Sequence, residues 1–180
     1  MKILAIDTST LVMGVAVLEE NKVLGELITN SLKKHSVRLM PAVDQLMKEL
    51  ELTVEDIDLL AVTKGPGSYT GIRIGVTTAK TLAWVHQIPL YGISTLAVLA
   101  ENGFYFDGWV VPMIDARRER VYAGVYRREG NDLQEVLSPQ VIPISSLLDY
   151  LKKYEQPVLF LGDDCATFSE QIETKLKEQA

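Results

Sequence analysis

The sequence of 180 residues predicts an α/β protein built from two lobes that repeat one order of elements. Three observations carry this prediction. Apolar residues recur with a period of two in some segments and of about 3.6 in others, as they do in strands and helices. The order of three strands, helix, strand and helix occurs twice along the chain. The first strand of each half ends in an aspartate, at Asp7 in LAIDTST and at Asp115 in PMIDARR.

The first half begins with short apolar runs separated by polar turn residues, which predict strands. A helical face spaced from Leu39 to Leu50 follows, and Pro41 must lie in the first turn of this helix or kink it. Thr53 and Asp56 have the spacing of a capping box that opens a short helix. The expected elements are strands 3–6, 14–18 and 23–28, helix 36–52, the short helix after 53, strand 59–62, helix 70–86, strand 89–93 and helix 94–100.

The second half repeats this order, although its letters differ. The expected elements are strands 109–114, 121–127 and 133–137, helix 145–154, strand 158–161 and helix 167–177. A duplicated meander of three strands, each followed by alternating helices and strands, is the plan of the actin-like ATPase folds, which are ribonuclease H-like. The sequence therefore predicts a duplicated actin-like fold, with an N-terminal lobe at 1–103 and a C-terminal lobe at 104–180.

Composition limits the function classes. The formal charge of −6 and the pI of about 5.0 argue against autonomous binding of nucleic acid, which usually needs a basic face. The one dense basic run is Arg117-Arg118-Glu119-Arg120, and binding of nucleic acid as part of a complex stays open. Cys165 is the single cysteine, so no internal disulfide can form and a cytoplasmic address is expected. No apolar run reaches the roughly 18 residues of a membrane span.

The turn after the first strand is the first candidate nucleotide-facing loop, because small hydroxylated side chains and free backbone N–H groups suit phosphates. The loop consists of Asp7, Thr8, Ser9 and Thr10. The plainer alternative is a strand end with turn-forming residues. The matching turn at 115–119 has arginines and no glycine, and the late stretch 161–164 has one glycine beside two carboxylates. The frame therefore resembles an ATPase whose nucleotide loops are degraded.

The stretch TKGPGSYTGIRIG, from Thr63 to Gly75, supplies the second candidate loop. It lacks the lysine of a P-loop, and it ends in threonine where the Rossmann fingerprint needs glycine. Pro66 also removes an N–H donor that an anion would use. The candidate nucleotide-facing residues here are Gly65, Gly67, Ser68, Tyr69 and Thr70.

The helix after this loop has small residues at every fourth position: Gly71, Gly75, Ala79 and Ala83. This spacing forms a ridge almost without side chains, and two interior glycines cost a helix about 1 kcal/mol each. Something must pack closely on the ridge to offset that cost. The two alternatives are the protein's own sheet or neighbouring helix, which the spacing alone slightly favours, and another subunit.

No catalytic constellation is evident. His35 and His86 are far apart, and neither has a partner at metal-binding spacing. Cys165 has Asp163 and Asp164 nearby and no basic neighbour that would lower its pKa, so a reactive thiol is not expected. We therefore expect no catalytic residue, no metal and no cofactor.

Three segments together closely resemble the TsaB family, also called YeaZ: MKILAIDTST at 1–10, KGPGSYTGIRIG at 64–75 and MIDARRERVYAGVY at 113–126. The second is highly specific, and the later part of the chain matches more loosely. The chain is shorter than is usual for the family, which leaves a short version or a missing final segment as alternatives. The paired histidines that hold metal in TsaD-like sequences have no counterpart, because His35 stands alone. The resemblance therefore does not imply a metallopeptidase.

The resemblance implies a non-catalytic scaffold. It would pair with a TsaD-like transferase and a TsaE-like P-loop ATPase to modify the adenosine next to the anticodon of tRNA, with tRNA bound only through the complex. It also implies a homodimer through the same region, and it shifts the ranking for the ridge toward subunit contact. The implied interface residues are His35, Arg38, Leu39, Val43, Met47, Gly71, Arg73, Gly75, Ala79 and Ala83. Replacing Gly75 by leucine is then expected to abolish pairing and leave the fold mostly intact. The alternative function is an autonomous actin-like ATPase or sugar kinase.

Overall fold

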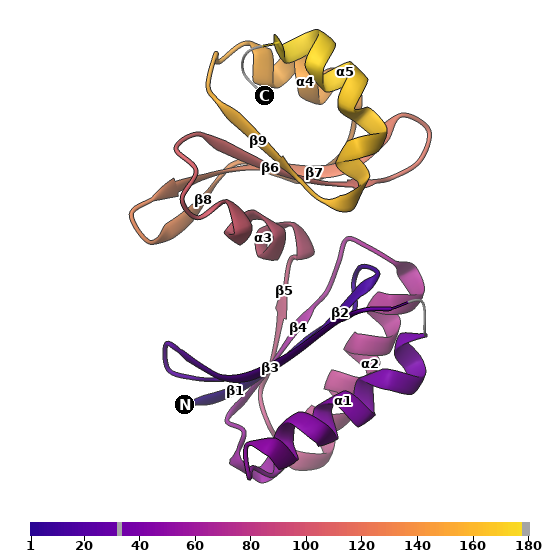
Figure 1. Cartoon of the computed structure of the whole chain (residues 1–180), viewed down its shortest axis with the longest axis vertical. Coiled ribbons are helices and arrows are strands. Elements are labelled where there is room, and N and C mark those ends of the chain that lie inside the picture. Colours follow the sequence, from indigo (N-terminus) through magenta and orange to yellow (C-terminus); the bar gives the residue numbers. More distant parts are fainter. Residues whose placement is uncertain (32–33, 178–180) are drawn as a thin grey trace. The chain divides into compact units, whose positions relative to one another are not determined.

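The computed structural model describes residues 1–31 and 34–177, which fall into two compact units, Met1–Thr95 and Leu96–Ala180 (Figure 1). The sequence places the lobe boundary after residue 103 instead. The units divide earlier because Leu96 and Ala100 are packed in a core with residues of the second unit. The boundary after residue 103 stays a prediction about domains, and each unit is described here by itself.

The first unit contains a five-stranded sheet in the order β3-β2-β1-β4-β5. Its strands are β1 (Lys2–Asp7), β2 (Val12–Glu19), β3 (Lys22–Asn30), β4 (Leu59–Thr63) and β5 (Leu90–Ile93). The first three strands form an antiparallel meander, and β4 and β5 extend it in parallel on the other side of β1. The parallel strands require crossover connections, and helices supply these connections.

Two long helices of the first unit, α1 (His35–Glu49) and α2 (Tyr69–His86), cover one face of this sheet (Figure 1). Because strand side chains alternate between faces, Leu4 and Ile6 of β1 point into the helix-covered core. The helices close this core with their own buried residues, which are Leu39, Ala42, Val43, Leu46, Met47 and Ala79. The short 3-10 helix η1 (Val54–Asp56) leads into β4.

The small-residue ridge of α2 packs inside this unit. A Cβ added at Gly71 would lie less than 3.0 Å from the carbonyl oxygen of Thr8, and one added at Gly75 would lie less than 3.0 Å from Thr8 Oγ1. Ala79 is fully buried. The structure therefore supports the internal alternative for these three positions: the ridge lets α2 lie directly against the end of β1.

The second unit has a four-stranded sheet in the order β8-β7-β6-β9. Its strands are β6 (Trp109–Asp115), β7 (Arg120–Glu129), β8 (Asp132–Pro143) and β9 (Val158–Leu161). Its helical segments are α3 (Thr95–Ala100), which begins at the last residue of the first unit, η2 (Glu101–Gly103), α4 (Ile144–Lys152), η3 (Asp163–Phe168) and α5 (Ser169–Leu176). The helices α4 and α5 share a core with Val121, Ala123 and Val125 of β7, whereas α3 packs with Val110 and Tyr126.

The order of elements predicted from the sequence is confirmed in both units, and the differences are local. Strand β8 extends to Pro143, well past the predicted end at 137, because it pairs with the full length of the long strand β7. Helix α1 stops at Glu49, and Glu51 then takes a left-handed conformation. The last helix begins at Ser169 because a 3-10 segment precedes it. In the described part of the chain, no helix combines the length and apolarity that crossing a bilayer requires.

We predict that Gly75→Leu destabilises the first unit, which changes the expectation drawn from the sequence that the fold would stay mostly intact. The new side chain collides with Thr8, and overpacking of this kind costs about 2 kcal/mol or more in the free energy of unfolding. Urea denaturation of the purified variant measures the loss. Thr77→Leu is the matched control, because Thr77 is exposed on the same helix. Equal stability of Gly75→Leu and the wild type would contradict the internal packing of the ridge.

Candidate functional site

The carboxylate of Asp7 organises the turn after β1. Its Oδ1 atom accepts hydrogen bonds from the backbone nitrogen of Ser9 at 2.8 Å, from Ser9 Oγ at 2.6 Å and from Thr63 Oγ1 at 2.8 Å. Thr63 ends β4, which lies parallel to β1, so two strand ends meet at one oxygen atom. Hydrogen bonds to a charged acceptor are stronger than neutral ones, and this turn is therefore firmly held.

The turn after β4 is fastened to the turn after β1. The backbone nitrogen of Ser68 donates to the carbonyl oxygen of Ser9 at 2.7 Å, and Thr8 Oγ1 donates to the carbonyl oxygen of Gly71 at 2.7 Å. Ser68 also caps α2, because its hydroxyl accepts from the backbone nitrogen of Gly71 at 3.2 Å. At Gly67 the backbone has φ +152°, and a Cβ there would collide with the carbonyl oxygen of Ser9. Glycine is required at this position for both reasons.

The structure thus brings the two candidate nucleotide-facing loops together, but it turns their most buried hydroxyls inward. Thr8 is 1% exposed and Ser9 is 0% exposed, and both hydroxyls donate to atoms of the same unit. The exposed members of the loops are Ser68, Tyr69 and Thr70. Facing a nucleotide stays a prediction for both loops, and these exposed residues are the ones most accessible to a ligand.

Tyr69 and Arg73 form an exposed pair at the first turn of α2. Arg73 Nη1 donates to the hydroxyl of Tyr69 at 3.2 Å, and the guanidinium carbon lies 5.2 Å from the centre of the ring. Both side chains are exposed. The pair places a positive charge and an aromatic ring on the surface next to the glycine-rich loop.

His35 and Arg38 hold the start of α1 on the meander. His35 Nε2 lies 2.9 Å from the carbonyl oxygen of Thr10, which can only accept, so this nitrogen carries the proton. Arg38 donates to the hydroxyl of Thr29 on β3. Within residues 1–31 and 34–177, no group of three or more histidine, cysteine, aspartate or glutamate side chains is placed to hold a metal ion. His35 therefore has a structural contact in place of ligand partners.

The interface residues expected from the sequence fall mostly inside the first unit. Leu39, Val43, Met47, Gly71, Gly75 and Ala79 are buried, His35, Arg38 and Ala83 are half-buried, and Arg73 is exposed. The apolar period of a helix identifies its buried face, and here the sheet of the same unit covers that face. Partner contact through α1 and α2 stays a prediction. The exposed residues of these helices, in place of the buried ones, are now expected to make it.

The opposite side of the two helices carries apolar residues that the sequence analysis missed. Trp84 is 77% exposed, Val37 is 67% exposed and Met40 is 45% exposed. We call this surface the outer helical face, and define it by Val37, Met40 and Pro41 of α1 and by Arg73, Thr77, Lys80 and Trp84 of α2. A signal was available, because Trp84 lies across the helix from the small-residue ridge, among polar positions where a tryptophan is unusual.

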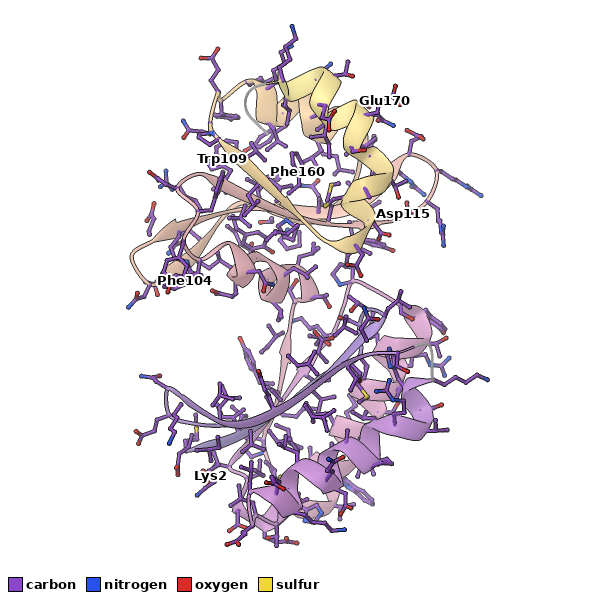
Figure 2. All side chains as sticks on the ribbon, in the orientation of Figure 1. Lys2, Phe104, Trp109, Asp115, Phe160 and Glu170 are labelled. Carbon is purple, nitrogen blue, oxygen red and sulfur yellow. The ribbon has the colours of Figure 1, made fainter. Side chains whose placement is uncertain are left out.

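The corresponding turn of the second unit follows Asp115 at the end of β6 (Figure 2) and is built differently. Asp115 Oδ1 accepts from the backbone nitrogen of Arg117 at 2.8 Å, and the backbone nitrogen of Asp115 donates to Asp164 Oδ2 at 2.8 Å. Burial raises the pKa of the Cys165 thiol to about 11, and the negative charges of Asp164 and Asp163 add to the effect. A thiol with this pKa is almost fully protonated near neutral pH, which agrees with the expectation of an unreactive cysteine.

Each unit begins with an antiparallel meander and fastens the end of its first strand through an aspartate. Two parallel strands extend the meander in the first unit and one in the second, and together the units define a protein of the duplicated actin-like fold. The family model TsaD, tRNA N6-adenosine threonylcarbamoyltransferase, matches residues 22–179. The TsaB protein of Bacillus subtilis strain 168 is 47% identical over 176 residues. The chain belongs to the TsaB family, also called YeaZ, and has a role in the biosynthesis of threonylcarbamoyladenosine in tRNA.

The matches extend through most of the chain. The alignment with the Bacillus subtilis protein covers 98% of this chain and 77% of that protein. TsaB of Escherichia coli K12 is 34% identical, with coverage of 79% and 64% respectively. The solved structure of YeaZ from Pseudomonas aeruginosa has a TM-score of 0.72 and 34% identity, and the match covers 79% of this chain and 66% of that one. The resemblance stated from three sequence segments is therefore confirmed.

We predict that Asp7→Ala lowers the free energy of unfolding by about 3 kcal/mol. The substitution leaves the donors of Ser9 and Thr63 without their acceptor, and hydrogen bonds to a charged group contribute about 1.5–3 kcal/mol each. Guanidinium denaturation followed by circular dichroism measures the change. Asp7→Asn should lose less, since an amide oxygen can still accept. Asp44→Ala removes an exposed ion pair with Lys48 and should change stability by less than about 1 kcal/mol. A loss no greater for Asp7→Ala than for Asp44→Ala would contradict the role of Asp7.

Proposed function

We propose that this chain is a non-catalytic subunit that docks a TsaD-like transferase on the outer helical face. A TsaE-like P-loop ATPase joins the pair, and tRNA is engaged only through the complex, which acts in the cytoplasm. The complex transfers a threonylcarbamoyl group to the adenosine next to the anticodon of tRNAs that read codons beginning with A. The proposal extends the family's established role in threonylcarbamoyladenosine biosynthesis to a specific division of labour.

The outer helical face is the observation that carries the proposal. Trp84, Val37 and Met40 expose apolar side chains in a layer of two neighbouring helices. Exposed tryptophan and methionine are enriched where proteins bind one another, and a buried tryptophan often contributes much of the binding free energy. Arg73 and Lys80 lie on the same face and supply the polar rim that such interfaces have.

The state of the candidate nucleotide loops supports a non-catalytic role. An actin-like ATPase needs side chains and backbone groups free to hold phosphates at the turn after the first strand. In this chain the hydroxyls of Thr8 and Ser9 and the Oδ1 atom of Asp7 are already committed to bonds inside the unit. A phosphate would have to displace contacts that hold α2 on the sheet.

We predict that Trp84→Ala weakens binding to the TsaD-like subunit about 30-fold or more, since a truncated hot-spot residue costs about 2 kcal/mol or more. Met40→Lys should weaken binding further by placing a charge in the apolar layer. Isothermal titration calorimetry with the TsaD-like subunit of the same organism measures the affinity. Because both residues are exposed, thermal unfolding of the isolated variants should stay close to that of the wild type.

Tyr105→Ala is the control for this experiment, because Tyr105 is an aromatic residue 96% exposed in the second unit. Its affinity for the TsaD-like subunit should equal that of the wild type. Unchanged binding by both Trp84→Ala and Met40→Lys would contradict docking through the outer helical face. The oligomeric state of the same variants shows whether a homodimer uses this face too, since the dimer should then weaken in parallel.

We predict that the isolated chain shows no tight binding of ATP with magnesium and no turnover of ATP. The alternative function, an autonomous actin-like ATPase or sugar kinase, requires a phosphate site that the internal bonds of Thr8 and Ser9 oppose. Calorimetry with the purified chain measures binding, and phosphate release measures turnover. Micromolar affinity together with hydrolysis in the absence of any partner would favour the alternative and contradict the scaffold.

A further inference from the structure

The turn between β6 and β7 holds the densest group of arginines in an otherwise acidic chain. Three consecutive residues, Arg117, Arg118 and Glu119, have left-handed backbones with φ of 65°, 56° and 55°. Backbone bonds close the turn, since the nitrogen of Ala116 donates to the carbonyl oxygen of Arg120 at 2.9 Å. A conformation that non-glycine residues rarely adopt is thus held in one arrangement.

The acidic side chains of this region are engaged at the base of the turn. Asp115 accepts from the backbone nitrogen of Arg117 at 2.8 Å and pairs with its guanidinium at 3.3 Å. Glu119 Oε2 accepts from the side-chain amide of Gln171 at 3.1 Å. Arg118 and Arg120 are exposed, and neither has an ion pair with any residue in 1–31 or 34–177. Two guanidinium groups are therefore left for an external anion.

An exposed aromatic residue lies two positions after Arg120, on the same face of β7. Side chains alternate along a strand, so Arg120 and Tyr122 project from one face of β7 while Val121 and Ala123 point into the core with α4 and α5. Tyr122 is 37% exposed, and its cross-strand neighbour Val141 is 45% exposed. We call Arg118, Arg120 and Tyr122 the basic–aromatic strip.

We infer that the basic–aromatic strip is the surface through which this chain contacts RNA once it is part of the assembled complex. The arginines bind backbone phosphates, and Tyr122 stacks on an unpaired base, which is how single-stranded RNA is commonly bound. The inference rests on the proposed function, because the RNA is the tRNA handled by the complex. The net charge of −6 disfavours binding by the isolated chain, and Arg118 and Arg120 belong to the densest basic run of the sequence.

The test measures tRNA binding by the complex reconstituted from this chain and its TsaD-like and TsaE-like subunits. Arg118→Gln combined with Arg120→Gln should weaken binding and reduce the slope of log K against log salt by about one per lost phosphate contact. Arg127→Gln is the matched control, because Arg127 lies at the other end of β7 and pairs with Glu129. This control should leave both the affinity and the slope unchanged.

Tyr122 supplies an independent readout. Tyr122→Ala should weaken tRNA binding about tenfold, as expected for the loss of one base stacked on an aromatic ring, whereas Tyr122→Phe should keep most of the affinity. Thermal unfolding of each variant separates a loss of binding from a loss of folding. If Tyr122 only packs, Tyr122→Ala will lower the unfolding temperature while the folded variant binds tRNA with unchanged affinity, which would contradict stacking on a base.

Complex assembly, followed by size-exclusion chromatography, separates the two levels of the hypothesis. If the wild-type chain does not assemble with the TsaD-like subunit, both the proposed function and this inference fail. If the variants assemble normally and bind tRNA with unchanged affinity and slope, the inference alone fails. If the variants lose assembly and keep the binding of tRNA per complex formed, the strip is a protein contact and the inference is overturned.

Discussion

The bonds accepted by the Asp7 carboxylate are the interaction on which the first unit depends. One oxygen atom joins the end of β1 to the end of β4 through Ser9 and Thr63. The carbonyl oxygen of Ser9 then accepts a hydrogen bond from the backbone nitrogen of Ser68, and Ser68 caps α2. The helix can lie this close to the strand end because its facing positions, at Gly71 and Gly75, have no side chain. The two strand ends, the loop after β4 and the start of α2 are therefore held together by one set of contacts.

This set of contacts has a consequence for function. Groups that would bind phosphate in an actin-like ATPase are occupied in holding α2, so the inner side of the turn has few donors left to offer a ligand. The helices that the turn positions expose a different surface, with Trp84 and Met40 pointing away from the sheet. A rigid helical layer with apolar side chains outside is well suited to docking, because little conformational entropy is lost when it binds.

The two halves share one local hydrogen bond at the end of the first strand, although the turns that contain it differ. In each, the aspartate that ends the first strand accepts a hydrogen bond from the backbone nitrogen two residues later, at 2.8 Å in both Asp7 and Asp115. In the first unit the turn is buried beneath α2, and in the second it projects arginines from a left-handed backbone. The same hydrogen bond is thus present in both turns, whereas the side chains around it serve packing in the first unit and present charge in the second.

The sequence by itself determined the order of elements, the duplicated fold and the family, because apolar periods and short motifs such as GPGSYTGIRIG are local properties of the chain. It also identified the two loops, Asp7 to Thr10 and Gly65 to Thr70, that the structure brings together. Only the tertiary structure decided whether the protein's own sheet or a partner subunit covers the apolar face of each helix. The helical period shows that Leu39, Val43 and Gly75 must be buried. It does not show what buries them, because the sheet of their own unit and a partner subunit would present the same apolar environment. Only the positions of the elements in space show that the sheet of the same unit covers them.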